Sequence, residues 1–341
     1  MNRYRSLDVL RGLTIAFMII VNAPGNTLAG LGQLHHAAWN GFTLTDLVFP
    51  TFLFVVGNAM SFTMSKFDKE DQGSFLIKVF KRTLIIYVAG VFLNTYPFFH
   101  MADVRLVHVL GRIALCYCAV SLIIYYAGPV TAYVISIVSL LAYWWILYQF
   151  GDQPDPYSLT GNAVAKLDLI VIGTNHIWHG EGVPFDPEGL LSTLPAIANV
   201  AAGYFAGRYL QRNGASTPAV LRLIIGGVVF VAIAVLWNET FPINKKLWTS
   251  SYVMLTVGLD LLILSMLVYV IEIRKAESGL WFFEVFGKNP LVLYVLSYLI
   301  TKPLYYIPDA HFVPLVPAIS ILMIVWVAGY LMDRKKMYFK V

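Results

Sequence analysis

The chain has 341 residues, of which 58% are hydrophobic and only 13% are charged, and its mean hydropathy is +0.70. Because a soluble domain carries about 25% charged residues, this composition excludes an ordinary soluble globular protein. The formal net charge of +5 does not indicate nucleic-acid binding, because Lys and Arg in a membrane protein first report its orientation.

Apolar segments recur along the whole chain, and several reach the roughly 20 residues that cross a bilayer as a helix. Open sheets are excluded within lipid because their unpaired backbone groups are too costly there. The sequence therefore predicts an all-α fold, a polytopic transmembrane helical bundle that forms a single domain over residues 1–341. Ten spans are predicted, at residues 8–22, 42–62, 80–95, 106–126, 131–148, 190–210, 221–237, 250–271, from about 286, and 313–331.

The first span begins with Ser6, Asp8 and Arg11. Ser6 resembles an N-cap, and Asp8 and Arg11 are spaced to form an ion pair along a helix. Two interpretations of this segment remain open. It is a helix start with a local ion pair, or it contributes to binding a ligand phosphate.

The longest polar connection runs over residues 149–189, and residues 164–172 within it are predicted to form a short interfacial helix or strand. A loop of this length is often functional. With the N-terminus in the cytoplasm, about seventeen of the 24 Lys and Arg lie on the cytoplasmic side. This distribution predicts a multi-pass plasma-membrane protein, in the inner membrane if bacterial, with both termini cytoplasmic.

Residues 34–50 concentrate chemistry-bearing side chains between two apolar segments. His36 can take a proton near neutral pH, since the unperturbed pKa of histidine is about 6.5. Asp46, about one turn into the second span, can orient His36 and stabilise its protonated form. Asn22 ends the first span on the same side, where its amide can donate to a developing oxyanion. A base, an orienting carboxylate and an oxyanion donor are the groups that acyl transfer requires.

The histidines do not form a metal-binding pattern. His35 and His36 are adjacent, His35 is interpreted as an interfacial residue, and no HExxH sequence is present. No metal is predicted. A zinc site made of His176, His179 and a carboxylate is the alternative interpretation.

Several motifs follow one another in order along nearly the whole chain: SLDxxRG at 6–12, VN at 21–22, HAxWNG at 36–41, TDLVFP at 45–50, RIALCY at 112–117, FDPEGLL at 185–191, PINKKLW at 242–248 and GKNP at 287–290. In these motifs the chain resembles the heparan-α-glucosaminide N-acetyltransferase family. The resemblance implies a homodimeric enzyme that uses cytoplasmic acetyl-CoA to acetylate an amino sugar, of the glucosamine type, presented from the other side. It also implies that His36 and Asn22 are active-site residues.

The acceptor amine arrives largely as an ammonium ion and must lose a proton before it attacks a thioester. We expect His36 to act as the general base, a role worth roughly 10²–10⁴-fold. The outer carboxylates are expected to attract the ammonium: Asp46, Asp186 and Glu188. Trp39 is the first candidate for stacking on the sugar, with Trp178 and Trp248 as further candidates, and Asn40 of the same motif is predicted to contact the substrate.

Coenzyme A phosphates require cations on the cytoplasmic side, and Arg208, Lys288 and Arg82 are the candidates, with Asn289 for polar contacts. The orientation rule alone also explains each cytoplasmic arginine. Arg112 lies within the fourth span, where a charge is costly unless paired. It either pairs with Asp46 or lines a tunnel for the pantetheine arm.

Two catalytic routes fit these residues. In the direct route both substrates bind together, and in the other His36 is acetylated first. The direct route is favoured because it needs no stable acyl-imidazole at a wet surface. Two other functions remain as alternatives, a sugar or amino-sugar transporter and an O-acetyltransferase of an envelope polysaccharide. The transporter is disfavoured because the chain has no internal repeat and its polar groups gather at one face of the bundle.

Overall fold

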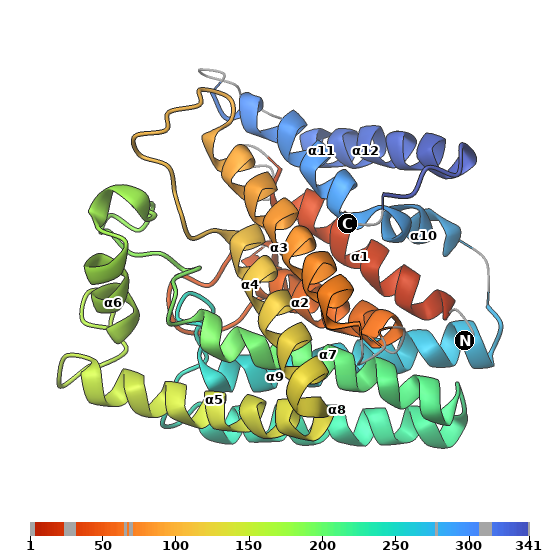
Figure 1. The fold of residues 1–341 in the computed structure, drawn as a ribbon, viewed down its shortest axis with the longest axis horizontal. Helices are drawn as coiled ribbons and strands as arrows, with labels where there is room; N and C mark the ends of the chain where they lie inside the picture. The colour runs from red at the N-terminus through yellow and green to blue at the C-terminus, as the bar shows by residue number, and fades with distance from the viewer. Residues whose placement is uncertain are drawn as a thin grey trace.

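The computed structural model describes residues 4–23, 32–64, 67, 71–276, 279–306 and 316–339. Within these residues the chain is helical and contains no β-strand (Figure 1), which confirms the predicted all-α class. The longer helices are α1 (Arg5–Val21), α2 (Leu44–Thr63), α3 (Gln72–Thr95), α4 (Val109–Leu122), α5 (Gly128–Phe150), α7 (Thr193–Asn213), α8 (Thr217–Trp237), α9 (Ser250–Leu267), α11 (Pro290–Leu304) and α12 (Val316–Arg334). Each of the ten predicted ranges overlaps one of them.

Two shorter helices complete the described chain, α6 (Ala163–Val171) and α10 (Trp281–Lys288). The short element predicted within the long loop is therefore the helix α6. By length and composition, five stretches of the described chain are able to cross a membrane: Leu44–Thr63, Val109–Phe150, Thr217–Trp237, Ser250–Ile273 and Val316–Arg334. The bent pair α10 and α11 adds a sixth if it counts as one span. These helices fit a multi-pass membrane protein, and the ten-span topology stays a prediction.

The stretch Val109–Phe150 contains 42 residues. At 1.5 Å per residue it would be about 63 Å long, roughly twice the thickness of a bilayer's hydrocarbon core. The chain turns at Gly128, whose φ of +83° suits a residue without a side chain. Figure 1 shows α4 and α5 running in different directions from this point. The two spans predicted here therefore correspond to α4 and α5.

The predicted ninth span begins later than expected. Helix α10 and helix α11 meet at an angle of 91°, so the range from about 286 does not form one straight helix. Pro290 has no N–H and disfavours the helical conformation of the residue before it. Asn289 accordingly takes φ −134° and ψ 53°, which are not helical.

Helices α2 and α7 approach each other through glycines. A Cβ atom on Gly57 would lie 1.8 Å from the backbone oxygen of Val200, and one on Gly203 would lie 1.8 Å from that of Phe54. Small residues allow such close backbone packing in membrane helices, where hydrophobic burial does not drive helix association. This contact fixes α2, and α2 carries Asp46 in its first turn.

The loops that join the helices gather at one end of the bundle, which we call the site end: residues 32–43, 96–108, 149–192 and 238–249. Gly41 N–H donates to the Ile243 carbonyl oxygen at 2.8 Å. Trp39 Nε1 donates to the Tyr157 carbonyl oxygen at 2.9 Å. The His36 segment, the long loop and the 238–248 connection therefore lie together at the site end.

Candidate active site

Three charged or titratable side chains meet at the site end. His36 Nδ1 lies 2.7 Å from Asp46 Oδ1. Lys245 Nζ lies 2.8 Å from His36 Nδ1 and 3.2 Å from Nε2, and 3.4 Å from Asp46 Oδ1. His36 comes from the loop before α2, Asp46 from the first turn of α2, and Lys245 from the loop before α9. We call these three residues the His36 cluster.

The local sequence explains why Asp46 holds this position. Thr43 is the N-cap of α2 and Asp46 is the third residue of the helix, as in a capping box. Asp46 Oδ2 accepts hydrogen bonds from Thr43 N at 3.1 Å, from Thr43 Oγ1 at 3.0 Å and from Ala37 N at 3.2 Å. Oδ1 is left for His36 and Lys245. The side chain is fully buried, and its contacts suit orientation of His36. That Asp46 also attracts the substrate ammonium stays a prediction.

The surroundings of His36 favour the neutral form of its imidazole. Burial lowers the pKa of the imidazole below its usual value, Asp46 opposes that shift, and the positive charge of Lys245 adds to it. Burial also lowers the pKa of Lys245, against the attraction of Asp46 and Glu188. The His36 side chain is 48% exposed, so a neutral imidazole faces solvent at the site end and is able to accept a proton.

A second ion-pair network lies beside this cluster. Arg105 donates from Nε to Asp186 Oδ2 at 2.8 Å and from Nη2 to Asp186 Oδ1 at 2.5 Å, and Nη2 also contacts Glu188 Oε2. Asp186 is fully buried and also accepts from the backbone N–H groups of Trp178 and Glu188. Both oxygens of Asp186 are occupied by these partners, and its contact with the substrate ammonium stays a prediction. It holds Arg105 and the loop in place.

Glu188 links the two networks. Burial alone would raise the pKa of its carboxyl group, but the cations Arg105, Arg112 and Lys245 lower it below its ordinary value. Its charge also acts on His36. The side chain is 10% exposed. Of the three carboxylates predicted to attract an ammonium ion, Glu188 has the most exposed side chain, and its contact with a substrate stays a prediction.

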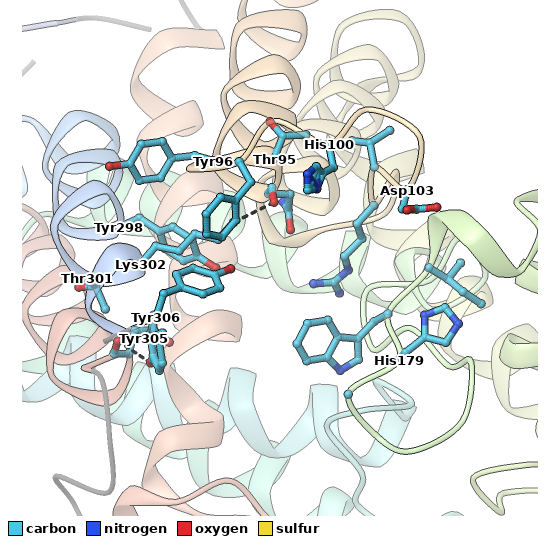
Figure 2. Close-up of a pocket in the computed structure, with 18 residues that line it drawn as sticks. Thr95, Tyr96, His100, Asp103, His179, Tyr298, Thr301, Lys302, Tyr305 and Tyr306 are labelled. Atoms are coloured by element: carbon cyan, nitrogen blue, oxygen red, sulfur yellow. Dashed lines mark hydrogen bonds between the residues drawn. The ribbon is translucent and has the colours of Figure 1, made fainter. Parts of the chain in front are cut away.

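A pocket of about 840 Å³ opens at the site end, beside Arg105. Its described walls come from the ends of α1, α3 and α11 and from the loops after α3 and α6, and they are rich in aromatic and polar side chains. Figure 2 shows Tyr96, Tyr298 and Tyr306 on one side of the pocket and Asp103 and His179 on the other. A volume of this size falls in the range of small-molecule sites, about 300–1,000 Å³.

Asn22 lines this pocket, whereas His36 does not. Among the described residues no hydrogen bond or ion pair joins Asn22 to His36. The Asn22 carbonyl oxygen accepts from the Tyr305 hydroxyl at 3.2 Å. The structure therefore places Asn22 and His36 at the same end of the bundle, and the predicted oxyanion role of Asn22 stays a prediction.

The tryptophans separate into exposed and buried ones. Trp178 is 44% exposed, lines the pocket and lies under the Arg105 guanidinium. Trp248 is 1% exposed, and its Nε1 donates to Asn199 Oδ1 at 3.1 Å. The prediction that Trp248 binds substrate is wrong, because its ring is buried in the core.

Trp39 and Asn40 of the HAxWNG motif are held by neighbouring loops. The ring of Trp39 packs edge-on against Phe185, with 5.4 Å between centroids. Asn40 Oδ1 accepts from Asn244 Nδ2 at 3.1 Å. Trp39 therefore supports the loop that carries His36, and Trp178 is better placed than Trp39 to contact a ligand in the pocket.

Arg112 is buried, and its contacts differ from the predicted pair with Asp46. Nη2 donates to the Pro187 carbonyl oxygen at 2.9 Å and contacts Ser192, and the guanidinium lies 4.7 Å from the centre of the Trp248 ring. Lys245 takes the place of Arg112 beside Asp46. Arg112 fixes the turn that carries Glu188.

A smaller cavity of about 190 Å³ lies between α1, α2, α3, α4 and the junction of α10 with α11. Three cations line it: Arg11, Arg82 and Lys288. Arg82 Nε is buried and has no hydrogen-bond partner among the described residues, and Lys288 pairs with Asp333 at 2.7 Å. The cavity thus brings together two predicted coenzyme A ligands and Arg11.

Two other predicted coenzyme A ligands lie elsewhere. Asn289 is 1% exposed and is occupied by the C-terminal segment, donating from Nδ2 to the Met337 carbonyl oxygen and accepting from Phe339 N. Its side chain is therefore not free to contact a cofactor. Arg208 lines a separate cavity on another side of the bundle, with Arg212.

Sequence reasoning missed Arg105 and Lys245 as site residues. Both were visible as rare cations among the segments predicted to lie on the outer side, where a positive charge has no role in orientation. The alternative zinc site gains no support: His176 Nδ1 lies 2.8 Å from the Val104 carbonyl oxygen. The described part of the chain contains no group of three His, Cys, Asp or Glu side chains able to hold a metal ion.

Comparison with known proteins places these features in a family. A family model described as an acyltransferase domain matches residues 4–332. The chain is 27% identical over 354 residues to heparan-alpha-glucosaminide N-acetyltransferase of Homo sapiens, and 28% identical over 352 residues to the same enzyme of Mus musculus. Each alignment covers 86% of this chain, but only 52% and 53% of the two relatives. The chain thus spans about half the length of the curated relatives it matches.

Proposed function

The chain belongs to the acyltransferase family, and on that premise we propose that it is a membrane N-acetyltransferase that moves the acetyl group of acetyl-CoA to the amine of a glucosamine-type sugar. The observation that carries the proposal is the His36 cluster, in which a neutral imidazole is oriented by a buried carboxylate beside a cation. The relationship to heparan-alpha-glucosaminide N-acetyltransferases supports the choice of donor and acceptor.

The acceptor sugar is assigned to the 840 Å³ pocket. Aromatic rings with polar edges suit a ligand that has both an apolar face and hydroxyl groups, and Trp178 and Tyr298 supply such rings. Glu188, at the Arg105 wall, supplies the negative charge that attracts an ammonium group toward the His36 cluster. A pocket of this kind fits an amino sugar better than a neutral one.

In the proposed reaction, His36 removes a proton from the sugar ammonium, and the free amine attacks the thioester carbonyl carbon. The carbon–nitrogen bond forms, a tetrahedral oxyanion develops, and the carbon–sulfur bond then breaks. His36 passes that first proton to solvent, takes a second proton from the attacking nitrogen of the tetrahedral intermediate, and donates it to the departing thiolate, so that the neutral amide and the free thiol result. Asp46 stabilises the imidazolium through Nδ1, which leaves Nε2 as the base.

Two groups are proposed to stabilise the oxyanion, Lys245 from the His36 cluster and the Asn22 amide from the pocket. Direct transfer needs no acetylated enzyme. It is therefore favoured over a route in which His36 carries the acetyl group.

Coenzyme A is proposed to enter from the opposite end of the bundle. Its phosphates would contact Arg11, Arg82 and Lys288 in the smaller cavity. Arg11 precedes Asn22 by eleven residues on α1, or roughly 16 Å at 1.5 Å per residue. Helices α1, α3 and α11 each contribute to both cavities. An extended pantetheine arm lying along them would place its thioester near Asn22.

This arrangement implies that donor and acceptor reach the protein from opposite sides of the membrane. We propose that the smaller cavity and both termini face the cytoplasm of a plasma membrane and that the site end faces outward. The assembly is proposed to be a homodimer, as the family resemblance implies.

The test is acetyl transfer from radiolabelled acetyl-CoA to glucosamine by the purified protein in detergent. We expect wild type to transfer the label and His36→Ala to lose about 10³-fold or more of the activity, in line with loss of a general base. Binding of acetyl-CoA, measured separately, should persist in the variant. Lys246→Met is the matched control, because Lys246 neighbours the cluster but pairs with Glu181.

Other results of this experiment would each favour one of the alternative functions or routes. Wild type that binds acetyl-CoA but acetylates only hydroxyl groups of sugars would make the protein an O-acetyltransferase. Labelled acetyl groups trapped on His36 would replace direct transfer with the two-step route. Protein that binds no acetyl-CoA while moving sugar across a vesicle membrane would contradict the proposal.

A further inference from the structure

A pair of adjoining cavities lies among α5, α7, α8 and α9, which run together in the lower part of Figure 1. The larger cavity, of about 490 Å³, is almost entirely apolar, with walls that include Leu140, Leu223 and Val257. The smaller one, of about 390 Å³, contains Arg208 and Arg212. Neither cavity contains a residue of the candidate active site.

The two cavities share Tyr133, Phe205 and Tyr209, so they adjoin. Four residues of α7 line the larger cavity, and their spacing of three or four places them on one face of the helix: Ala198, Ala202, Phe205 and Tyr209. This stripe covers eleven residue steps, or roughly 16 Å at 1.5 Å per residue. That length is close to half of the roughly 30 Å hydrocarbon core, which is the depth of one lipid leaflet. The arginines follow at the end of α7, where the leaflet's headgroups would lie.

One polar atom at the junction, the Tyr209 hydroxyl, stands out among the described residues. The Tyr209 hydroxyl is buried and has no hydrogen-bond partner among the described residues, an arrangement that costs free energy unless a ligand supplies one. Arg208 Nη1 donates to the Tyr204 hydroxyl at 3.0 Å. Arg212 is exposed beside it. An apolar channel that ends in an unsatisfied hydroxyl and two guanidinium groups matches a long-chain amphiphile with a negative headgroup.

We propose that these cavities form a binding site for an anionic phospholipid. One acyl chain occupies the apolar cavity, the phosphate lies between Arg208 and Arg212, and the Tyr209 hydroxyl donates to an ester oxygen. This assignment accounts for the position of Arg208 away from Arg82 and Lys288. It does not depend on the proposed acetyl transfer, because none of its residues belongs to that site.

The experiment is native mass spectrometry of the purified full-length protein, titrated with phosphatidylglycerol or with phosphatidylcholine of the same acyl chains. We expect wild type to bind phosphatidylglycerol more tightly. Arg208→Gln/Arg212→Gln should weaken phosphatidylglycerol binding by about tenfold to thirtyfold, since a basic residue near a lipid surface contributes about 1 kcal/mol, and leave phosphatidylcholine nearly unchanged. The matched control is Arg222→Gln/Arg274→Gln, which removes two arginines that line neither cavity.

Tyr209→Phe supplies a second measurement, because it removes only the buried hydroxyl. Since both lipids have ester groups, this variant should weaken both by a similar factor. Equal binding of the two lipids by wild type, or equal losses in the control pair, would overturn the proposal. Loss of coenzyme A binding in the Arg208/Arg212 variant would also overturn it, because the cavity would then belong to the cofactor. A change of that variant from dimer to monomer would overturn it too, because the cavity would then be occupied by a second copy of the chain.

Discussion

The ammonium of Lys245 lies 3.4 Å from the carboxylate of Asp46, and both groups contact the imidazole of His36. Two residues that are 199 positions apart in the sequence thus place opposite charges beside one histidine. Asp46 favours the protonated imidazole and Lys245 disfavours it. A general base has to be neutral before it acts and stable once it is protonated. Lys245 favours the neutral imidazole, and Asp46 stabilises the protonated one.

Removing the Lys245 charge should move the pH dependence of the reaction. His36 accepts a proton only when it is neutral, so kcat/KM should rise with pH through the pKa of His36, which lies below 6.5. In Lys245→Met one cause of that lowering is lost. We therefore expect the acid limb of the profile to shift to higher pH, and the plateau rate to fall by about tenfold or more if Lys245 also stabilises the oxyanion.

The measurement is kcat/KM for glucosamine from about pH 5 to 8 in wild type, Lys245→Met and Lys246→Met. The acceptor's own titration is common to all three proteins and cancels in the comparison. Lys246→Met should keep the wild-type acid limb, because Lys246 pairs with Glu181 and the Ala38 carbonyl oxygen. An acid limb that does not move in Lys245→Met would contradict the assigned influence of Lys245 on His36.

Glu188 and Asp186 should respond differently to neutralisation. Glu188→Gln removes the charge that attracts an ammonium group, so KM for an amino sugar should rise by about tenfold, with a smaller effect on stability. Asp186→Asn should instead destabilise the fold by about 2–3 kcal/mol, because Arg105 loses a buried charged partner. Steady-state kinetics and thermal unfolding in detergent separate the two effects. If the acceptor group were a hydroxyl instead of an amine, KM for the sugar should not depend on the Glu188 charge, and Glu188→Gln would leave it unchanged.

The sequence predicted the helices well because their apolar lengths and the Gly and Pro residues between them carry strong local signals. The predicted contact of Asp46 with His36 is observed, because the two residues are ten apart and the capping-box spacing from Thr43 fixes Asp46. What the sequence could not show is how the loops pack. Trp39 and Trp248 both stand in matched motifs, yet neither lines the pocket at the site end, and Trp248 is fully buried.

The sequence also does not reveal which residues the charged side chains contact. A pair with Asp46 is one of the two interpretations of Arg112 that the sequence allows, the other being a position along a tunnel for the pantetheine arm. In the structure Lys245 pairs with Asp46, whereas Arg112 donates to the carbonyl oxygens of Pro187 and Gly189 and contacts the hydroxyl of Ser192. Asn289 follows the same pattern, because its partners come from a tail that lies 48 and 50 residues further along the chain. Local patterns do not specify such long-range pairs.

Cofactor binding should depend on Arg82 and not on Arg208. Arg82 lines the smaller cavity, and its Nε has no hydrogen-bond partner among the described residues. Arg82→Gln removes this cation, so coenzyme A should bind about tenfold more weakly because a charge-assisted contact is lost. Arg208→Gln should bind coenzyme A as wild type does, since Arg208 lines a different cavity. Equilibrium binding of acetyl-CoA to the purified variants measures both. Weaker binding in Arg208→Gln, with unchanged binding in Arg82→Gln, would indicate that the cofactor binds among α5, α7, α8 and α9. That result would contradict the proposed path along α1, α3 and α11.

Two tryptophans test whether the 840 Å³ pocket holds the sugar. Trp178→Ala removes an exposed ring from the pocket wall, so KM for glucosamine should rise by about tenfold while the protein unfolds at nearly the same temperature. Trp248→Ala removes a buried ring that contacts Phe49, Tyr252 and Arg112, and it should destabilise the protein by about 3–5 kcal/mol. Kinetics and unfolding of both variants in the same detergent give the comparison. A Trp178→Ala enzyme with unchanged KM would place the acceptor outside this pocket, nearer to the exposed edge of His36.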